Sequence, residues 1–240
     1  IEPLKTLLGL VSSFCLLLKY RPKVIFSKGG YVSFPIIHFA KLFKIPYLIH
    51  ESDLGLGLAN RYAQSNAKKI FLGFPLDQYN NLPKTRVIFS GQVLRRNLTS
   101  DVSKSVELKD FYFSENKPVI LITGGSQGAS NINNNLMKAA SDLLKSYNII
   151  HQTGKNDFQK VKDFKDSLSE EKQRGYFIED HLTMVHGRDL MQEAIVLADL
   201  VISRAGATTV AELAAMKKTM ILIPYKYASR DHQTKNAEII

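Results

Sequence analysis

The sequence has little of several residue types that mark particular classes of protein. Its 240 residues include one cysteine, Cys15, and no tryptophan. A single thiol excludes an intrachain disulfide and is typical of a reducing compartment. No apolar run reaches the roughly 18 residues that a membrane-spanning helix needs. A disulfide-stapled scaffold is therefore excluded, and no segment is a candidate transmembrane helix.

Acidic residues are also scarce, and they are unevenly distributed. The chain holds 32 Lys and Arg against 22 Asp and Glu, a net charge of +10. Residues 1–90 carry 12 basic and 4 acidic side chains, whereas residues 91–240 carry 20 and 18. The basic first part predicts an anionic partner, either lipid headgroups or nucleic acid, unless its lysines serve only to keep the surface soluble. Because there is no nucleic-acid motif and no aromatic interleaving, we expect no nucleic-acid partner.

Metal-binding patterns are missing as well. The sequence has no Cys/His spacing of the zinc type and no Asp-x-Asp carboxylate pair. We therefore expect neither a metal nor another cofactor. A negatively charged leaving group would then have to be stabilised by helix N-termini.

The sequence does contain a regular alternation of strand and helix patterns. This alternation predicts an α/β fold with parallel sheets. An amphipathic helix is predicted over 4–18, with Leu8, Val11 and Cys15 in the core, and one charged helix over 155–174. The predicted strands are 24–26, 47–49, 69–72, 86–89, 117–123, 148–150, 176–178, 200–202 and 220–223.

The alternation is interrupted once, which predicts two domains. Residues 1–90 would form the first domain, 91–98 a hinge, and 99–240 the second domain. Both chain ends fall inside predicted helices. We therefore expect the native protein to extend beyond both ends, so that both domains are incomplete here.

A turn after the predicted strand 200–202 carries the most informative residues. The small residues 205–207 would let a ligand approach the backbone closely. The helix that follows offers N–H groups and partial positive charge at its start, which suits a diphosphate. Glu212, about one turn into that helix, could accept two hydrogen bonds from a ribose diol. The residues predicted to bind a nucleotide sugar here are Arg204, Gly206, Ala207, Thr208 and Glu212.

A second turn of the same kind follows the predicted strand 117–123. Its sequence GGSQGA places three glycines and a serine between a strand and a helix, a composition suited to phosphate. Two such turns favour a nucleotide-sugar site beyond the carboxyl ends of parallel strands. The alternative roles are a helix cap for Ser126 and a surface glutamate for Glu212. The predicted diphosphate-binding residues are Gly125, Ser126, Gln127 and Gly128.

Two further motifs lie at strand ends in the basic first part. The Gly-Gly pair before Tyr31 follows the strand 24–26, and His50-Glu51-Ser52-Asp53 follows 47–49. A plain tight turn and a core histidine are the alternatives. If the two sheets face each other, these motifs would bind the acceptor of a transferred sugar.

These motifs, together with DHQTKNA at 231–237, resemble the MurG family of peptidoglycan N-acetylglucosaminyltransferases over nearly the whole chain. The resemblance implies a GT-B fold, with two Rossmann-like domains facing a cleft. It implies UDP-N-acetylglucosamine as donor and, as acceptor, the C4 hydroxyl of the muramoyl sugar of lipid I. Transfer would invert the anomeric centre without a metal, and would form the β-1,4 link of lipid II on the cytoplasmic face of the bacterial membrane.

The resemblance also implies residue roles. Ser126 and its neighbours would hold the diphosphate, together with backbone near Ala207 and Thr208, and Glu212 would bind the ribose. Sugar hydroxyls would be read by Gln233 and Asn236, and Arg95 would lie near the nucleotide. The acceptor-side residues would be Tyr31, His50, Glu51 and Asp53.

The chain departs from the family pattern in three places. The N-terminal Gly-rich loop with the histidine proposed as general base is absent, so no base is assigned and these 240 residues alone should be inactive. The usual Asn-Pro after the hinge glycine is Gln92-Val93. The stretch 181–188 looks longer than usual, which leaves the uracil-contacting residue unplaced.

A membrane-bound acceptor gives the basic first part an interpretation. We expect an apolar and basic patch of Leu4, Leu7 and Leu10 with Lys5, Lys19, Arg21, Lys41 and Lys44 to dock on anionic membrane. Three alternatives remain open: a UDP-N-acetylglucosamine 2-epimerase, a transferase acting on another lipid, and a non-catalytic donor-binding subunit.

Overall fold

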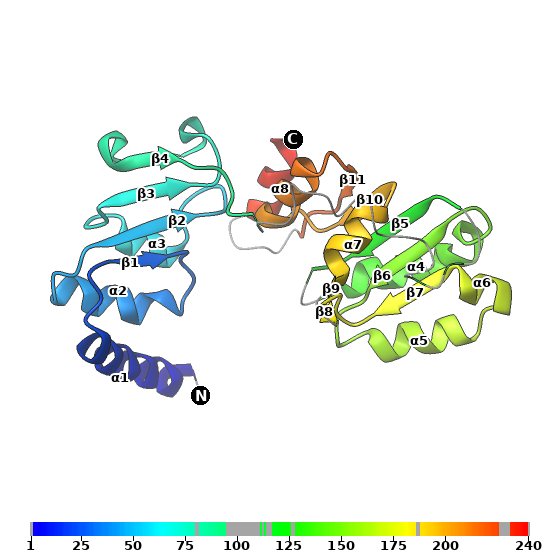
Figure 1. Cartoon of the computed structure of the whole chain (residues 1–240), viewed down its shortest axis with the longest axis horizontal. Coiled ribbons are helices and arrows are strands. Elements are labelled where there is room, and N and C mark those ends of the chain that lie inside the picture. Colours follow the sequence, from blue (N-terminus) through cyan, green and yellow to red (C-terminus); the bar gives the residue numbers. More distant parts are fainter. Residues whose placement is uncertain are drawn as a thin grey trace. The chain divides into compact units, whose positions relative to one another are not determined.

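A computed structural model describes residues 2–79, 82–94, 111, 113, 117–125, 128–185, 188–225 and 231–239, with side chains in the first helix from residue 8 onward. The chain divides into two compact units, residues 1–93 and 94–240 (Figure 1). The division falls within the segment 91–98 for which the sequence predicts a hinge. Each unit is described below by itself.

The first unit is built on one parallel sheet. Its strands pair in sequence order, β1-β2-β3-β4, and α2 and α3 provide the first two crossovers. Two 3-10 turns, Leu76–Gln78 and Lys84–Arg86, precede the last strand. The elements are α1 (Glu2–Tyr20), β1 (Ile25–Ser27), α2 (Ser33–Leu42), β2 (Tyr47–Glu51), α3 (Leu58–Ala63), β3 (Lys69–Leu72) and β4 (Val87–Phe89).

The core of this unit lies between the sheet and the two crossover helices. Alternate residues of β2 and β3 are fully buried, as the period of two in a strand requires. The Tyr47 hydroxyl donates to the Ala63 carbonyl at 2.8 Å, so that its polar end is satisfied inside the core. Buried side chains of this core include Ile37, Ala40, Tyr47, Ile49, Ala63, Ile70 and Leu72.

The packing of α1 differs from the sequence prediction. Leu8 and Val11 are 58% and 57% exposed, and Cys15 is exposed as well, so the prediction that they lie in the core is wrong. The helix packs on α2, where Gly9 lies against Pro35, and among its side chains from residue 8 onward Ser13 and Leu17 are buried. The Phe14 ring also packs against the rings of Phe39 and Phe43, with centroids 5.4 and 5.7 Å apart, so the contact with α2 leaves Leu8 and Val11 exposed.

The second unit is a five-stranded parallel sheet in the order β11-β10-β5-β6-β7. A two-stranded antiparallel hairpin, β8-β9, lies outside it. The strands are β5 (Val119–Thr123), β6 (Asn148–Gln152), β7 (Tyr176–Glu179), β8 (Met184–Val185), β9 (Arg188–Asp189), β10 (Leu200–Ser203) and β11 (Thr219–Leu222). The helices are α4 (Ser130–Leu143), α5 (Phe158–Asp166), α6 (Glu170–Arg174), α7 (Leu190–Leu197), α8 (Ala207–Ala215) and α9 (His232–Glu238).

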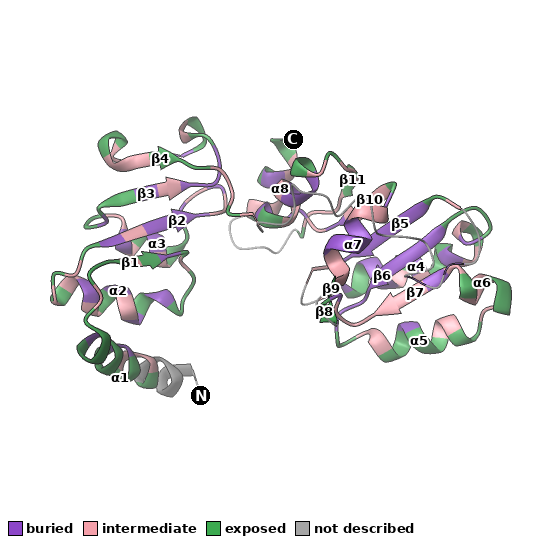
Figure 2. Ribbon diagram, viewed as in Figure 1, coloured by how far each residue is buried: buried purple, intermediate pink, exposed green. Residues whose placement is uncertain are grey.

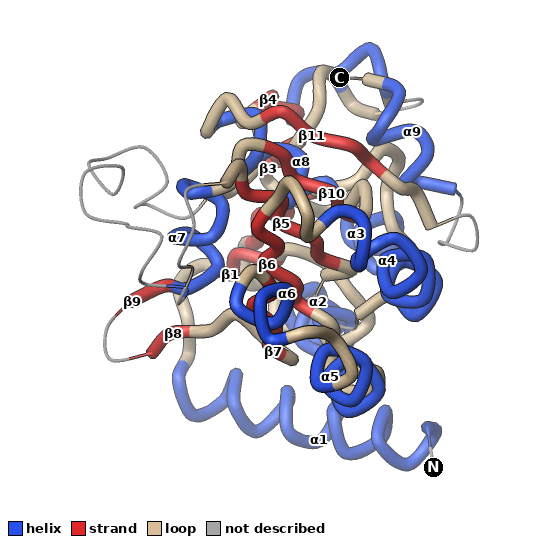
Figure 3. Tube along the Cα trace, turned by 90° about the vertical axis from the view of Figure 1, so that its right-hand side faces the viewer, coloured by secondary structure: helices blue, strands red, loops and turns tan. Residues whose placement is uncertain are grey.

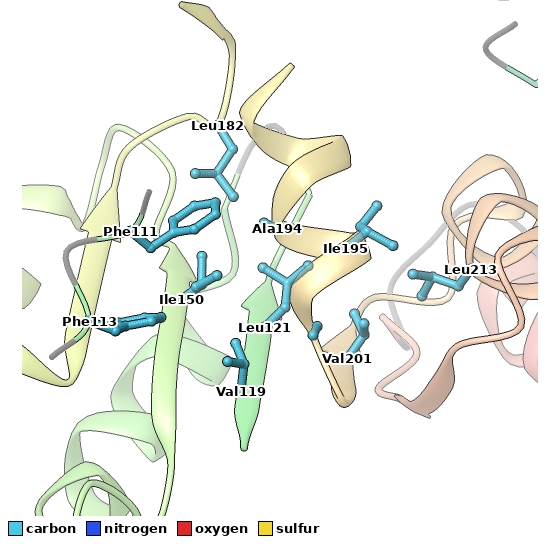
Figure 4. Close-up of a cluster of buried hydrophobic side chains, with 11 residues drawn as sticks. Phe111, Phe113, Val119, Leu121, Ile150, Leu182, Ala194, Ile195, Val201 and Leu213 are labelled. Atoms are coloured by element: carbon cyan, nitrogen blue, oxygen red, sulfur yellow. The ribbon is translucent and has the colours of Figure 1, made fainter. Parts of the chain in front are cut away.

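Two cores cover the two faces of this sheet. On one face, α4 and α5 bury residues such as Ile120, Ile149 and Val161. On the other face, Leu121 and Ile150 gather with residues of α7 and α8 (Figure 4). Figure 2 shows the central strands buried along their length, and Figure 3 shows α4 and α5 on one side of them and α7 on the other. The sequence prediction of parallel α/β sheets is therefore confirmed.

Two local predictions in this unit are wrong. The charged segment 155–174 forms two helices, α5 and α6, rather than one. The Ser167 hydroxyl donates to the Phe164 carbonyl at 2.6 Å, and the Gln173 amide donates to the Leu168 carbonyl at 2.8 Å, so side chains satisfy the backbone where the first helix ends. The stretch after β7, in which the sequence analysis predicts no strand, contains the β8-β9 hairpin.

Candidate functional site

A pocket of about 240 Å³ opens in the second unit where its strands end. Because all five strands are parallel, the turns that follow them meet at one edge of the sheet. The polar lining comes from four of these turns or their helices, and the apolar lining includes Leu121, Val201 and Leu213. The polar side of the pocket is formed by Thr123, Gly125, Gln152, His181, Thr209 and Glu212.

The glycine-rich turn after β5 leads directly into α4. Gly125 and Gly128 have φ values of +81° and +74°, in the left-handed region that favours glycine. The Gly128 N–H donates to the Gly125 carbonyl at 3.0 Å. A Cβ on Gly128 would lie 2.5 Å from the Thr153 carbonyl oxygen, so this glycine lets two turns pack against each other.

We expect Gly128→Ala to damage this turn strongly. The added methyl group would meet backbone that cannot move aside as a side chain does, and the left-handed φ adds a cost of about 1 kcal/mol. The loss in unfolding free energy should exceed about 2 kcal/mol. Urea denaturation measures it, with Gly30→Ala as control, because that glycine has a similar φ of +78° and open space around it. Equal losses in the two variants would contradict the steric argument.

The turn after β10 places Glu212 in the pocket. Gly206 precedes α8, and Glu212 lies in the second turn of this helix, where it is buried. Ala207 is buried beside it and Thr208 is exposed at the start of the helix. Gly125 and Glu212, which the sequence assigns to two separate motifs, line the same pocket.

Three other predicted donor-site residues brace the neighbouring loops. Arg204 donates to the carbonyls of Ile223 and Pro224, at 3.1 and 3.2 Å, and burial lowers the pKa of its guanidinium. Gln233 accepts from the Tyr225 N–H at 2.9 Å. Asn236 is fully buried, and its amide donates to the Ala205 carbonyl at 3.1 Å. These contacts hold the segments after β10 and β11 together, and sugar contacts of these residues stay predictions.

Several predicted residues lie outside the described part of the chain. They are Arg95, Ser126 and Gln127, together with the side chains of Leu4, Lys5 and Leu7.

In the first unit, the acceptor-side motifs differ sharply in exposure. Tyr31 is 89% exposed, whereas His50 and Glu51 are buried. The Glu51 carboxylate accepts from the Asp53 N–H at 3.1 Å, from the Gly57 N–H at 2.8 Å and from the Asn60 amide at 3.0 Å. Glu51 therefore organises the loop between β2 and α3, and Asp53 is half-buried at its start.

His50 is connected to the segment that leads out of this unit. Its Nε2 lies 3.1 Å from the Gly91 carbonyl, and its Nδ1 lies 3.3 Å from the Ser52 hydroxyl. Gln92, which stands where the family resemblance leads one to expect asparagine, donates to the Ser52 carbonyl at 2.5 Å. The motif 50–53 thus fixes the start of the segment predicted as a hinge. His50 is therefore placed as a buried core histidine, which is one of the two interpretations that the sequence leaves open.

Sequence reasoning missed the end of β6 and the turn that follows it, His151-Gln152-Thr153-Gly154. Gln152 lines the pocket, and Thr153 is the residue that packs against Gly128. The sequence signal was present, because a polar run ending in glycine follows an apolar strand there too. Thr123, Thr209 and His181 were also missed, since single polar residues carry no motif.

His151 is the centre of a buried network beneath this turn. Its Nδ1 lies 2.9 Å from the Tyr176 hydroxyl and its Nε2 lies 2.9 Å from Asn133 Oδ1. The Asn133 amide donates to the Thr153 carbonyl and to Asp157, which links α4 to the turn. Burial lowers the pKa of the His151 imidazole to about 4, although Asp157 acts in the opposite direction.

This lowered pKa predicts a pH-dependent stability. Because the unfolded imidazole has a pKa of about 6.5, the unfolded chain takes up the proton first as the pH falls. The contribution of neutral His151 is present above about pH 6.5 and is lost as the pH falls towards about 4. Between about pH 7.5 and about pH 5 the unfolding free energy should drop by about 2 kcal/mol from this group. Urea midpoints across this range measure the drop, which should be smaller in His151→Gln; an unchanged pH slope would contradict the assignment.

Two negative findings concern the described residues. Among them, no helix is both long and apolar enough to span a bilayer. Nor does that part of the chain contain a group of three or more His, Cys, Asp and Glu side chains placed to hold a metal ion.

Comparison with known families accounts for both units. Residues 119–240 match the glycosyltransferase family 28 C-terminal domain, and residues 1–72 match the glycosyltransferase family 28 N-terminal domain. The chain belongs to glycosyltransferase family 28. The predicted resemblance and the predicted α/β fold of the GT-B class are thereby confirmed.

Two family 28 proteins illustrate the sequence similarity. Both are named UDP-N-acetylglucosamine–N-acetylmuramyl-(pentapeptide) pyrophosphoryl-undecaprenol N-acetylglucosamine transferase. The protein from Bacillus thuringiensis strain Al Hakam is 38% identical over 238 residues, and that from Lachnoclostridium phytofermentans is 39% identical over 239. Each alignment covers 99% of this chain, which spans 63% of the length of these curated relatives.

Two solved structures illustrate the structural similarity. Acinetobacter baumannii MurG superposes with a TM-score of 0.65 at 29% identity, over 98% of this chain and 63% of that one. The UDP-GlcNAc 2-epimerase from Neisseria meningitidis, bound to UDP-GlcNAc, gives a TM-score of 0.59 at 16% identity, over 89% of this chain and 62% of that one. The second likeness concerns the fold alone.

Proposed function

We propose that the intact protein is an inverting family 28 glycosyltransferase of peptidoglycan synthesis. It transfers N-acetylglucosamine from UDP-N-acetylglucosamine to the C4 hydroxyl of the muramoyl sugar of lipid I, and the product is lipid II. The observation that carries the proposal is the pocket at the carboxyl edge of the second sheet, where the glycine-rich turn and Glu212 come together. The names of the relatives at 38–39% identity support the choice of substrates.

The donor would bind at the turns after β5 and β10. Backbone N–H groups near Gly125, Gly128 and Ala207 would receive the diphosphate at the starts of α4 and α8, where the helix dipoles favour negative charge. Glu212 would accept hydrogen bonds from the ribose diol inside the pocket. The departing UDP gains negative charge as the glycosidic bond breaks, so the same N–H groups would stabilise the transition state without a metal.

The acceptor would bind to the first unit. Tyr31 and Asp53 lie on its accessible loops, whereas buried His50 and Glu51 would act by holding those loops in place. None of these four residues is proposed as the general base.

Membrane contact would use the exposed face of α1. Leu8, Val11 and Leu18 are at least half exposed and recur at helical spacing, and Lys19 and Arg21 are exposed where the helix ends. Leu10, part of the patch predicted from sequence, is half-buried, and the Lys41 ammonium bonds to the Tyr62 carbonyl of α3. The patch would therefore consist of Leu8, Val11, Leu18, Lys19, Arg21 and Lys44, on the cytoplasmic face of the membrane.

The reaction is tested with the intact gene product. We expect transfer from labelled UDP-N-acetylglucosamine to a lipid I analogue, and little transfer from UDP-glucose or UDP-galactose. Turnover of UDP-N-acetylglucosamine without acceptor would instead indicate an epimerase. Donor binding without transfer to lipid I would indicate another lipid acceptor or a non-catalytic subunit.

Membrane docking is tested with vesicles. Co-sedimentation of the intact protein should require anionic lipid and should weaken when Leu8 and Val11 are both changed to serine. The double change Lys160→Ser and Lys162→Ser, on the exposed side of α5 in the second unit, is the control. Equal co-sedimentation with anionic and neutral vesicles would contradict the docking proposal.

A further inference from the structure

The last residue of β6 contacts two neighbouring segments at once, the end of β5 with its turn and the segment after β7. The Gln152 amide nitrogen donates to the Thr123 hydroxyl and to the Gly125 carbonyl, each at 3.1 Å. The Gln152 amide oxygen accepts from the Leu182 N–H at 3.0 Å. Gln152 is 4% exposed, so these bonds form away from water. One buried side chain thereby links the ends of β5, β6 and the segment after β7.

These bonds fix the Gly125 peptide groups on both sides. The Thr123 hydroxyl accepts from the Gly125 N–H at 3.1 Å, while Gln152 holds the Gly125 carbonyl. Gly125 has a φ of +81° and no side chain, so its own conformational preference is weak. Thr123 and Gln152 therefore hold the N–H and the carbonyl of Gly125 in place.

The same amide also sets the opposite wall of the pocket. Leu182 and His181 line it from the segment after β7, and Gly125 and Thr123 line it from β5. The Gln152 side chain is hydrogen-bonded to both of these segments. Loss of the Gln152 amide would leave a buried carbonyl and a buried N–H without these partners, which favours local rearrangement.

We propose that Gln152 is a positioning residue of the donor site, which preorganises the glycine-rich turn and the Leu182 wall for a nucleoside diphosphate. The inference rests on the proposed function, because it assigns that ligand to this pocket. Gln152 acts through Gly125 and Leu182 rather than on the reacting atoms. A pocket already ordered before binding avoids the entropy cost of ordering it in the complex.

The first test uses Gln152→Leu in the intact protein. The affinity for UDP, measured by titration calorimetry, should fall about tenfold, which corresponds to about 1.4 kcal/mol. The KM for UDP-N-acetylglucosamine should rise by a similar factor, while the KM for the acceptor stays within about twofold. A purely structural role would change both KM values or neither.

Asn148→Ala is the matched control. Asn148 is buried at the other end of the same strand, where its amide donates to the Lys117 carbonyl at 3.3 Å. This change should lower stability and leave the affinity for UDP within about twofold. An equal loss of UDP affinity in Asn148→Ala and Gln152→Leu would overturn the inference, since general destabilisation would then explain both.

Thr123 supplies a second test if Gln152→Leu does not fold. Thr123→Val removes the hydroxyl at nearly constant volume and should also weaken UDP binding several-fold, whereas Thr123→Ser keeps the hydroxyl and should restore it. Wild-type UDP affinity in both Gln152→Leu and Thr123→Val would overturn the inference alone. Failure of the wild-type protein to bind UDP would overturn the proposed function as well.

Discussion

Glu212→Ala is expected to lower kcat/KM for UDP-N-acetylglucosamine by about 100-fold in the intact enzyme. The Glu212 carboxylate is buried in the pocket at the second turn of α8. Two hydrogen bonds from a ribose diol to a carboxylate are each worth about 1.5–3 kcal/mol, and 1.4 kcal/mol is a factor of ten. Steady-state kinetics with the donor varied at saturating acceptor measures the loss.

Two further variants separate ribose binding from general damage. Glu212→Gln keeps the shape and one acceptor atom, so its loss should be smaller than that of Glu212→Ala. Glu193→Gln changes another buried carboxylate of the same unit, which is paired with Arg188 through two hydrogen bonds. It should leave the donor KM within about twofold. A Glu212→Ala enzyme with a normal donor KM would refute the ribose assignment.

Glu51→Ala is expected to destabilise the first unit by about 3 kcal/mol or more. The change would remove the acceptor of three hydrogen bonds, from the N–H groups of Asp53 and Gly57 and from the Asn60 amide. Each buried donor left without a partner costs about 1–3 kcal/mol, and water entering the loop would recover part of that. Urea denaturation of the intact protein measures the loss.

Hydrogen exchange locates this effect within the molecule. Amide protons of residues 52–60 should exchange faster in Glu51→Ala, while those of β5 and β6 keep their protection. Asp77→Ala removes an exposed carboxylate of the same unit and should change stability by less than about 0.5 kcal/mol. A Glu51→Ala variant as stable as Asp77→Ala would show that the loop is held by other contacts.

The two predictions depend on different amounts of structural information. The sequence singles out Glu212 because a glutamate about one turn after a run of small residues suits a ribose diol, and the structure places it in the pocket. Glu51 is also singled out by sequence, but as an acceptor-side residue. Only the folded chain shows its carboxylate turned onto the backbone of its own loop. A sequence motif shows which residues occur together. It does not show which of them contact a ligand and which support the loop.

The sequence by itself determined the α/β class, the parallel strands and the two turns whose residues line the pocket. Apolar runs and glycines are local signals, since burial of a strand and a left-handed φ each restrict residue type directly. It also indicated the family, through motifs spread over most of the chain.

Only the tertiary structure decided which segments pack against the polar and apolar side chains of each helix and strand. It turned Leu8 and Val11 outward, because α1 packs on α2 through Gly9 and the Phe14 ring. It placed the Gln152 amide between turns that are about 30 residues away on either side in sequence. Periodicity specifies that a face is apolar or that a strand ends, but contacts between distant segments depend on close packing of the whole unit.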